Sequence, residues 1–360
     1  MLLLKVRDRD APVTREGLIF RVMGYDHPPN ACFCDVEYAP SSLYTSRDPR
    51  AYRCKNGVTY YKFYGDEGLR FVEEKFPEYR VFHEAMGSYL VGLREEQIRE
   101  VRRPDERILE IVGGAEDPLI RILLEVLDLV TSVTSLSIKD FGVFGSLLHN
   151  IYNVNYSDLD FIIYGYDNLQ ELLEGLKELY RDSSSGLRNE YRGPEPPDSR
   201  YRHFKDYTVK EYMWHQKRKL IYAVYEKGWR PVKIEFEPVR DWGEIVNEYP
   251  HLKRVEKVGF VEAIVYVADD RGAPFMPSIY RVEVLEASDK RALEAYRVVS
   301  YVEEYRMQLR RGEKGFVRGW LERLEWKGGE ETYQITLTYA RENYSRQILK
   351  VLSKNYNRGM

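Results

Sequence analysis

The run LDFIIY, from Leu159 to Tyr164, constrains the fold of this chain more than any other feature of its sequence. It is almost wholly apolar, it lies near the middle of a chain of 360 residues, and the aspartates Asp158 and Asp160 stand at its start. Strands buried on both faces have such continuous apolar runs, so we expect a central strand of a sheet. Residues two apart on a strand share a face, with α-carbons roughly 6 to 7 Å apart, so the two carboxylates are predicted to point together.

A third carboxylate is available in the segment 231–239, PVKIEFEPV. The alternation predicts a strand that has Lys233, Glu235 and Glu237 on one face. Glu235 is our candidate partner for the two aspartates, and Glu237 is the fallback because a shift of two residues keeps the same face. Carboxylates brought this close repel one another, and a hard divalent cation such as Mg²⁺ or Mn²⁺ relieves that repulsion. The alternative is structural: Asp158 caps a turn and Asp160 pairs with a basic neighbour.

A Gly-Ser pair, Gly145 and Ser146, precedes the aspartates, with Ser146 twelve positions ahead of Asp158. A strand at about 141–144 ends there and a short helix follows. Such a junction offers backbone N–H groups, a hydroxyl and the positive end of a helix dipole, which together suit a phosphate tail.

The order of these parts, VFGS, SDLDFII and KIEFEP, resembles the nucleotidyltransferase fold of the DNA polymerase beta superfamily, and especially uncharacterised archaeal predicted nucleotidyltransferases. That family has a strand ending in Gly-Ser, a helix, a strand with Asp-x-Asp, and a later strand with a third acidic residue. The motif match covers about 141–164 and the strand at Glu235. Many relatives have small or basic residues after Gly-Ser, where this chain has Leu147 and Leu148.

The resemblance implies two-metal transfer of a nucleotide from a nucleoside triphosphate to an acceptor hydroxyl, with release of pyrophosphate. It makes Asp158, Asp160 and Glu235 the metal-binding and catalytic residues, and Gly145 and Ser146 the phosphate-binding residues. A different class of function stays open: a non-catalytic scaffold that binds nucleotide or nucleic acid on the same fold. A Walker-type ATPase is disfavoured because the chain has no GxxxxGK[ST] motif.

The pattern along the chain predicts an α+β protein with three parts. Residues 1–100 form an N-terminal α+β module, with strands at 17–25, 31–40 and 59–65 and a helix at 67–79. Residues 104–245 form the nucleotidyltransferase-like domain, a mixed sheet with helices at 117–133, 168–180 and 206–228 and a loop at 181–202. Residues 246–360 form a β-rich barrel or sandwich, with strands at 259–269, 277–287, 298–309, 315–326 and 332–340, compatible with an OB-like nucleic-acid barrel.

An acceptor such as RNA or DNA has one candidate surface on the predicted helix 206–228. Lys210, Trp214, Lys217 and Arg218 fall on one arc of that helix. Positive charge next to an aromatic ring suits a phosphate chain and a stacked base. The alternative is a solvated helix face on which the tryptophan is half buried.

Three cysteines, Cys32, Cys34 and Cys54, could form a zinc site with His27, but no CxxC pair is present. The alternative, which we favour, is that Cys32 and Cys34 are small apolar residues on one face of a strand.

The bulk composition sets the remaining limits. A net charge of -3 argues against a globally basic nucleic-acid coat protein, and no run approaches the ~18 apolar residues that span a bilayer. We therefore expect a cytoplasmic protein without a membrane partner; its oligomeric state is left open. The chain is rich in Glu, Arg, Lys and Tyr and poor in Gln, which favours a thermophilic source.

Overall fold

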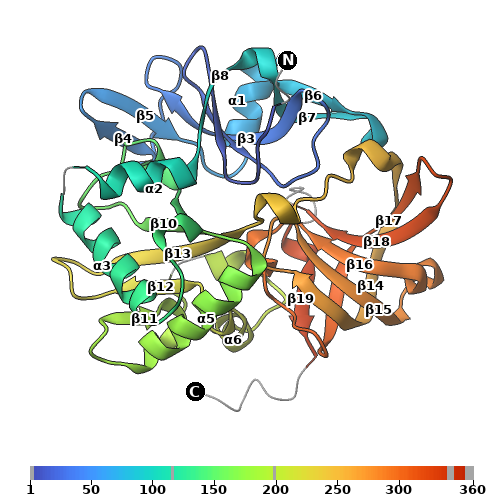
Figure 1. Ribbon diagram of the computed structural model, residues 1–360. Coiled ribbons are helices and arrows are strands. Elements are labelled where there is room, and N and C mark those ends of the chain that lie inside the picture. Colours follow the sequence, from blue (N-terminus) through green and yellow to red (C-terminus); the bar gives the residue numbers. More distant parts are fainter. Residues whose placement is uncertain (1–3, 115–116, 198–199, 339–343, 353–360) are drawn as a thin grey trace. The chain divides into compact units, whose positions relative to one another are not determined.

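The computed structural model describes residues 4–114, 117–197, 200–338 and 344–352 as a mixed α+β chain (Figure 1). The chain forms two compact units. Unit 1 holds residues 1–83, 87–188 and 223–250, and unit 2 holds residues 84–86, 189–222 and 251–360. Unit 1 therefore combines most of the expected N-terminal module with most of the expected central domain.

The first sheet of unit 1 follows the order β4-β5-β3-β2-β1-β8, with β7 also paired to β3 and β6 paired to β7. Its strands are β1 (Ala11–Thr14), β2 (Ile19–Val22), β3 (Ala31–Pro40), β4 (Tyr52–Lys55), β5 (Val58–Lys62), β6 (Arg80–His83), β7 (Ser88–Arg94) and β8 (Ile98–Arg102). Helix α1 (Glu67–Lys75) buries Phe71 and Val72 against this sheet. The strands and the helix predicted before residue 80 are confirmed.

The second sheet of unit 1 has the order β11-β12-β13-β10-β9. Its strands are β9 (Phe141–Val143), β10 (Leu159–Tyr164), β11 (Leu187–Asn189), β12 (Tyr222–Tyr225) and β13 (Val232–Val239). Strand β10 pairs in parallel with β13 and antiparallel with β9. The apolar run with which the sequence analysis began is therefore an interior strand, as predicted.

Four helices accompany this sheet: α2 (Pro104–Val112), α3 (Pro118–Ser132), α4 (Gly145–Leu148) and α5 (Tyr166–Arg181). Asp117 caps α3, since its Oδ1 accepts the N–H groups of Leu119 and Ile120 at 3.0 and 3.1 Å. Pro118 occupies the first helical position, where its missing N–H costs no hydrogen bond. The helix predicted at 117–133 is confirmed, and it buries Leu119, Leu123 and Val130.

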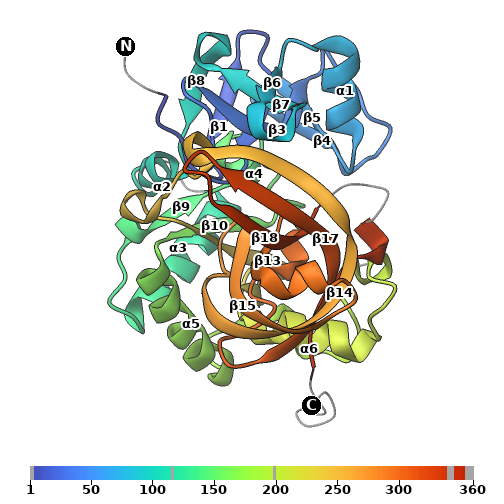
Figure 2. The ribbon, with the colours of Figure 1, turned by 90° about the vertical axis from the view of Figure 1, so that its right-hand side faces the viewer.

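Unit 2 holds α6 (Val209–Lys219) and a six-stranded sheet in the order β14-β15-β16-β18-β17-β19. Its strands are β14 (Leu252–Gly272), β15 (Ser278–Ala287), β16 (Ala295–Ser300), β17 (Lys314–Trp326), β18 (Glu331–Leu337) and β19 (Ile348–Val351). Strand β14 also pairs with β17, and Figure 2 shows β14 as a long, strongly curved strand. The strand predicted at 298–309 is wrong beyond Ser300, because residues Glu303–Tyr305 form a 3-10 turn. The last strand, predicted at 332–340, ends partly outside the described residues.

Two further predictions are wrong. The helix expected at 206–228 ends at Lys219, where Leu220 adopts a left-handed φ of 68°, and residues 222–225 form β12. The segment IYAVY is rich in aromatic and β-branched residues and pairs with β13, which outweighs continuation of the helix. The loop expected at 181–202 contains the edge strand β11.

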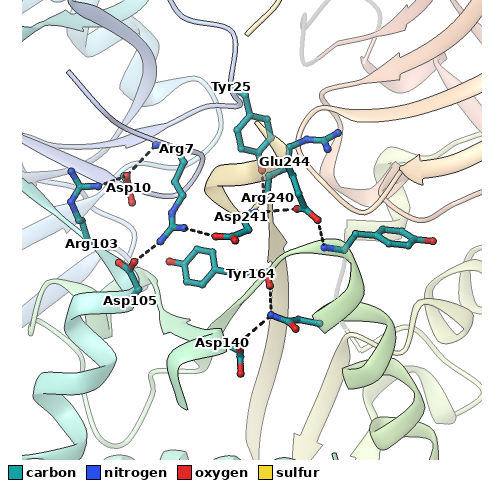
Figure 3. Close-up of polar contacts among 12 residues, drawn as sticks. Arg7, Asp10, Tyr25, Arg103, Asp105, Asp140, Tyr164, Arg240, Asp241 and Glu244 are labelled. Carbon is teal, nitrogen blue, oxygen red and sulfur yellow. Dashed lines mark hydrogen bonds and ion pairs between the residues drawn. The ribbon is translucent and has the colours of Figure 1, made fainter. Parts of the chain in front are cut away.

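The carboxyl ends of β10 and β13 are held by Arg7, which is 2% exposed. Its guanidinium lies 3.7 Å from the ring centroid of Tyr164, the last residue of β10, and 2.5 Å from a carboxylate oxygen of Asp105 (Figure 3). A second nitrogen lies 3.9 Å from Asp241, just beyond β13. This end of the strand pair is therefore closed by charged groups, whereas Asp158 stands at the other end.

Within the described residues, no helix has the length and apolar character that a membrane crossing requires.

Candidate functional site

Strand pairing brings Asp160 and Glu235 together. In the parallel register of β10 and β13, Asp160 lies opposite Glu235 and Ile162 lies opposite Glu237. Directly paired residues share a face of the sheet, so both glutamates stand on the face of Asp160. Asp158 immediately precedes β10 and is exposed, whereas Asp160 is half-buried. Sequence separation alone could not establish this pairing.

The Gly-Ser pair also lies against Asp160. Gly145 has a left-handed φ of 61°, and a Cβ on this residue would lie 2.5 Å from Oδ2 of Asp160. The backbone N–H of Phe144 donates to the carbonyl of Asp160 at 2.8 Å. Glycine is therefore needed here both for the backbone conformation and for the space beside the carboxylate.

Ser146 ties the short helix α4 to the turn that precedes Asp158. Its hydroxyl donates to Oγ of Ser157 at 3.2 Å, and Ser157 Oγ accepts the N–H of Asn153 at 2.9 Å. Ser146 is 9% exposed, and Leu147 and Leu148 are buried as well. Both residues of the Gly-Ser pair are therefore buried, and the Ser146 hydroxyl is hydrogen-bonded within the protein.

Negative charge accumulates around Asp160. Burial, together with the charges of Glu237 and Asp158, raises its pKa to about 7, although the charge of Lys62 lowers it. A carboxyl group whose pKa lies near neutrality among other carboxylates is a common feature of functional sites.

Glu237, our fallback residue, already has a counter-ion. Its carboxylate forms an ion pair with Arg9, and both side chains are buried. Asp8 is also buried beside Arg9, and burial raises the pKa of Asp8. Glu237 therefore balances a buried arginine, and its charge also raises the pKa of Asp160.

Lys62 and Arg230 were missed by the sequence analysis. Lys62, at the end of β5, lies with Nζ 3.6 Å from Glu37, and its charge acts on Asp160. Arg230 donates to the carbonyl oxygens of Ser157 at 2.5 Å and Val154 at 3.2 Å, and so holds the turn before Asp158. Nothing local in the sequence identifies Lys62, because its position depends on how the two sheets pack.

The carboxylates are suitable ligands for a hard cation, but their side chains do not converge on one position. Asp158, Asp160 and Glu235 offer the oxygen donors that Mg²⁺ and Mn²⁺ use. Among the residues that the structure describes, no three His, Cys, Asp or Glu side chains converge closely enough to hold a metal ion. A metal would therefore require side-chain rotation, for which the exposed Asp158 has room.

The cysteines lie elsewhere. Cys32 and Cys34, on β3, are buried in an apolar cluster of the first sheet, which confirms their interpretation as apolar residues. Cys54 is on β4. Burial lowers the pKa of His27 to about 4, and its Nδ1 accepts the N–H of Phe33 at 3.2 Å.

The four candidate acceptor residues lie on α6, in unit 2. Lys210 is exposed, and Trp214, Lys217 and Arg218 are half-buried. The Arg218 guanidinium lies 4.4 Å from the ring centroid of Trp214 and forms an ion pair with Glu313 at 2.6 Å. Two of the four residues therefore contact each other, and one of them is engaged by an internal carboxylate.

Comparison with known proteins gives one clear relationship. No family model matches the chain, and no solved structure matches it. The chain is 30% identical over 348 residues to an uncharacterised protein of Methanocaldococcus jannaschii, an alignment that covers 96% of this chain and 99% of that protein. Identity at this level along nearly the whole of both chains means that this chain belongs to the same family as the Methanocaldococcus jannaschii protein.

Proposed function

We propose that this protein is a metal-dependent nucleotidyltransferase that transfers a nucleotide from a nucleoside triphosphate to an acceptor hydroxyl, for example on RNA or DNA. The observation that carries the proposal is the position of Asp160. Its carboxylate lies against Gly145 and opposite Glu235, so three segments distant in sequence meet at one point. Burial first, and then the charges of Glu237 and Asp158, raise the pKa of Asp160, and a bound divalent cation would favour its ionised form.

In the proposed reaction, Asp158, Asp160 and Glu235 would hold two divalent cations. When bound, these ions supply charge neutralisation of the phosphates and acidification of the acceptor hydroxyl. The acceptor oxygen forms a bond to the α-phosphorus while the bond from that phosphorus to the bridging oxygen of pyrophosphate breaks. The proton of the hydroxyl passes to Glu235. The backbone amides of Gly145 and Ser146 would bind the departing phosphates. The Ser146 hydroxyl is not assigned this role because it donates a hydrogen bond to Ser157.

The β-rich part of unit 2 fits an acceptor-binding role. The pairings β14-β15, β15-β16, β16-β18, β18-β17 and β17-β14 return to the first strand. We therefore propose that these five strands close into a small barrel of the OB-like kind, an architecture that commonly binds oligonucleotides.

The test is incorporation of labelled nucleotide. The wild-type protein is incubated with each common triphosphate, Mg²⁺ or Mn²⁺, and total cellular RNA, and the label is followed into a product band. We expect transfer by the wild type and none by Asp160→Ala or Glu235→Gln. The control is Asp128→Ala, which removes an exposed carboxylate of α3 and should retain activity. If the wild type transfers no nucleotide to nucleic acid, protein or small acceptors, the catalytic proposal is wrong.

The second candidate function is a non-catalytic scaffold that binds nucleotide. One observation favours it: the described carboxylates do not already converge on a metal position. Both functions would give magnesium-dependent binding of triphosphate, so release of pyrophosphate is the measurement that separates them.

A further inference from the structure

The parallel pairing of β10 and β13 places two turns at the same edge of the second sheet. Residues 154–157 precede Asp158 and β10, and residues 226–231 connect β12 to β13. Parallel strands begin at the same edge, so the two turns are neighbours. Arg230 joins them through its hydrogen bonds to the carbonyl oxygens of Val154 and Ser157.

A cavity of about 520 Å³ opens between these two turns and the first half of α3; we call it the turn pocket. Its apolar wall includes Ile122, Val154 and Trp229, and its polar groups include Arg121 and Lys227. The volume lies within the ~300 to 1,000 Å³ that small-molecule sites usually have.

Gly228 sets the position of Trp229 at this pocket. A Cβ on Gly228 would meet the end of the Ile122 side chain, so the turn lies directly on α3 and a larger residue there would displace Ile122. Trp229 is 48% exposed, although tryptophan side chains are usually well buried. The fold therefore presents an indole ring to solvent at the mouth of a cavity.

The groups in the turn pocket match a nucleotide of a single strand. The Arg230 guanidinium lies 5.6 Å from the ring centroid of Trp229, and the half-exposed ring can still stack on a base. Two cations at the same cavity suit a phosphodiester. Glu125, the carboxylate of the lining, accepts the hydroxyl of Tyr225 at 2.8 Å and keeps its charge, so the two cations of the lining exceed its one anion.

We propose that the turn pocket binds the terminal nucleotide of a single-stranded nucleic acid, with its base on Trp229 and its phosphodiester beside Arg121 and Lys227. We assign it the role of acceptor subsite because Asp158 follows directly on the turn that lines the pocket. This role rests on the proposed function. All residues that line the pocket belong to unit 1, whereas the candidate residues on α6 belong to unit 2.

The experiment measures binding of fluorescently labelled ten-nucleotide RNA and DNA strands to the full chain in EDTA at several salt concentrations. Removing a stacked aromatic ring weakens binding, so we expect Trp229→Ala to raise Kd about 10-fold and Trp229→Phe to recover most of this loss. Lys227→Ala should reduce the slope of log K against log salt by about 0.7, the value for one phosphate of a single strand. Tyr89→Ala is the matched control, since Tyr89 is an exposed aromatic residue of β7 and does not line the pocket.

Unchanged affinity of Trp229→Ala, or no binding of either strand by the wild type at low salt, would overturn the proposal. Free triphosphate that competes as well as the strands would also overturn it, because the pocket would then take the donor nucleotide. Strand binding that depends on Trp229, in a protein that incorporates nothing, would support the pocket and refute the proposed function.

Discussion

Asp160→Asn should stabilise the protein at alkaline pH in the absence of metal. Asparagine keeps the shape of the side chain and removes its charge from a half-buried position beside Glu237 and Asp158. The wild type must hold that charge close to two other carboxylates once Asp160 ionises. A residue retained at a cost to stability is expected where function requires it.

The pH dependence follows from proton linkage. Burial, Glu237 and Asp158 raise the pKa of Asp160 to about 7, above the ordinary value of 3.8. Between these two pH values the folded state holds a proton that the unfolded state has lost, so the free energy of unfolding falls as pH rises. The fall is about 1.36 kcal/mol per pH unit, so raising the pH from 5 to 8 costs the wild type about 2 to 3 kcal/mol at this residue.

The assay is urea unfolding of wild type and Asp160→Asn at pH 5 and pH 8, in EDTA, followed by circular dichroism. We expect the free energy of unfolding of the variant, relative to wild type, to increase by about 2 to 3 kcal/mol between the two pH values. Burial also raises the pKa of Asp8 and of Asp10, but their titration cancels in this difference because both proteins contain them. Asp128→Asn, an exposed substitution on α3, should show no such increase. A variant whose relative stability does not change with pH would refute the assignment of a repelled carboxylate at Asp160.

Two further substitutions test the surroundings of this carboxylate. Gly145→Ala would place a methyl group 2.5 Å from Oδ2 of Asp160 on a left-handed backbone. Displacement of a catalytic group commonly costs about 10²-fold in rate, so we expect nucleotide incorporation to fall by about that factor with an unchanged circular dichroism spectrum. Full activity would contradict the position given to Gly145 beside Asp160. Arg9→Met would leave Glu237 buried without its Arg9 counter-ion and should lower the free energy of unfolding, measured in urea, by about 3 to 5 kcal/mol. The double variant Arg9→Met, Glu237→Gln should recover most of that loss. A double variant no more stable than the single one would show that the charge of Glu237 is not the cause.

Several elements of unit 1 could be predicted because they depend on local pattern. The run Leu159–Tyr164 is apolar on both faces, and 232–239 alternates, so their strands follow from side-chain periodicity. The cap at Asp117 follows from an Asp-Pro pair at the start of an apolar stripe. That Asp160 lies against Gly145 was implied by the family resemblance rather than by periodicity.

Other features could not be predicted because they depend on contacts between distant segments. The residues 222–225 continue a helical pattern in the sequence, yet they form β12 because a strand position beside β13 is available. Lys62 stands in an aromatic run with no sign of a site, and its charge reaches Asp160 only through packing of the two sheets of unit 1. Arg9 lies in the alternating charges RDRD, a pattern that could have drawn attention to a buried ion pair.

The electrostatics of Asp160 connect the two sheets of unit 1 to one proposed site. The carboxylates come from β10 and β13 of the second sheet, whereas Lys62 comes from the first sheet and Arg9 from the segment before β1. Arg9 compensates Glu237, and Lys62 compensates Asp160 only in part, since the pKa of Asp160 remains raised. Arg9 and Lys62 therefore offset part of the negative charge of the second sheet, while burial and the charges of Glu237 and Asp158 still raise the pKa of Asp160. A divalent cation bound there would favour the ionised form of Asp160, so the same carboxyl group weakens the metal-free fold at high pH and is our candidate for metal binding.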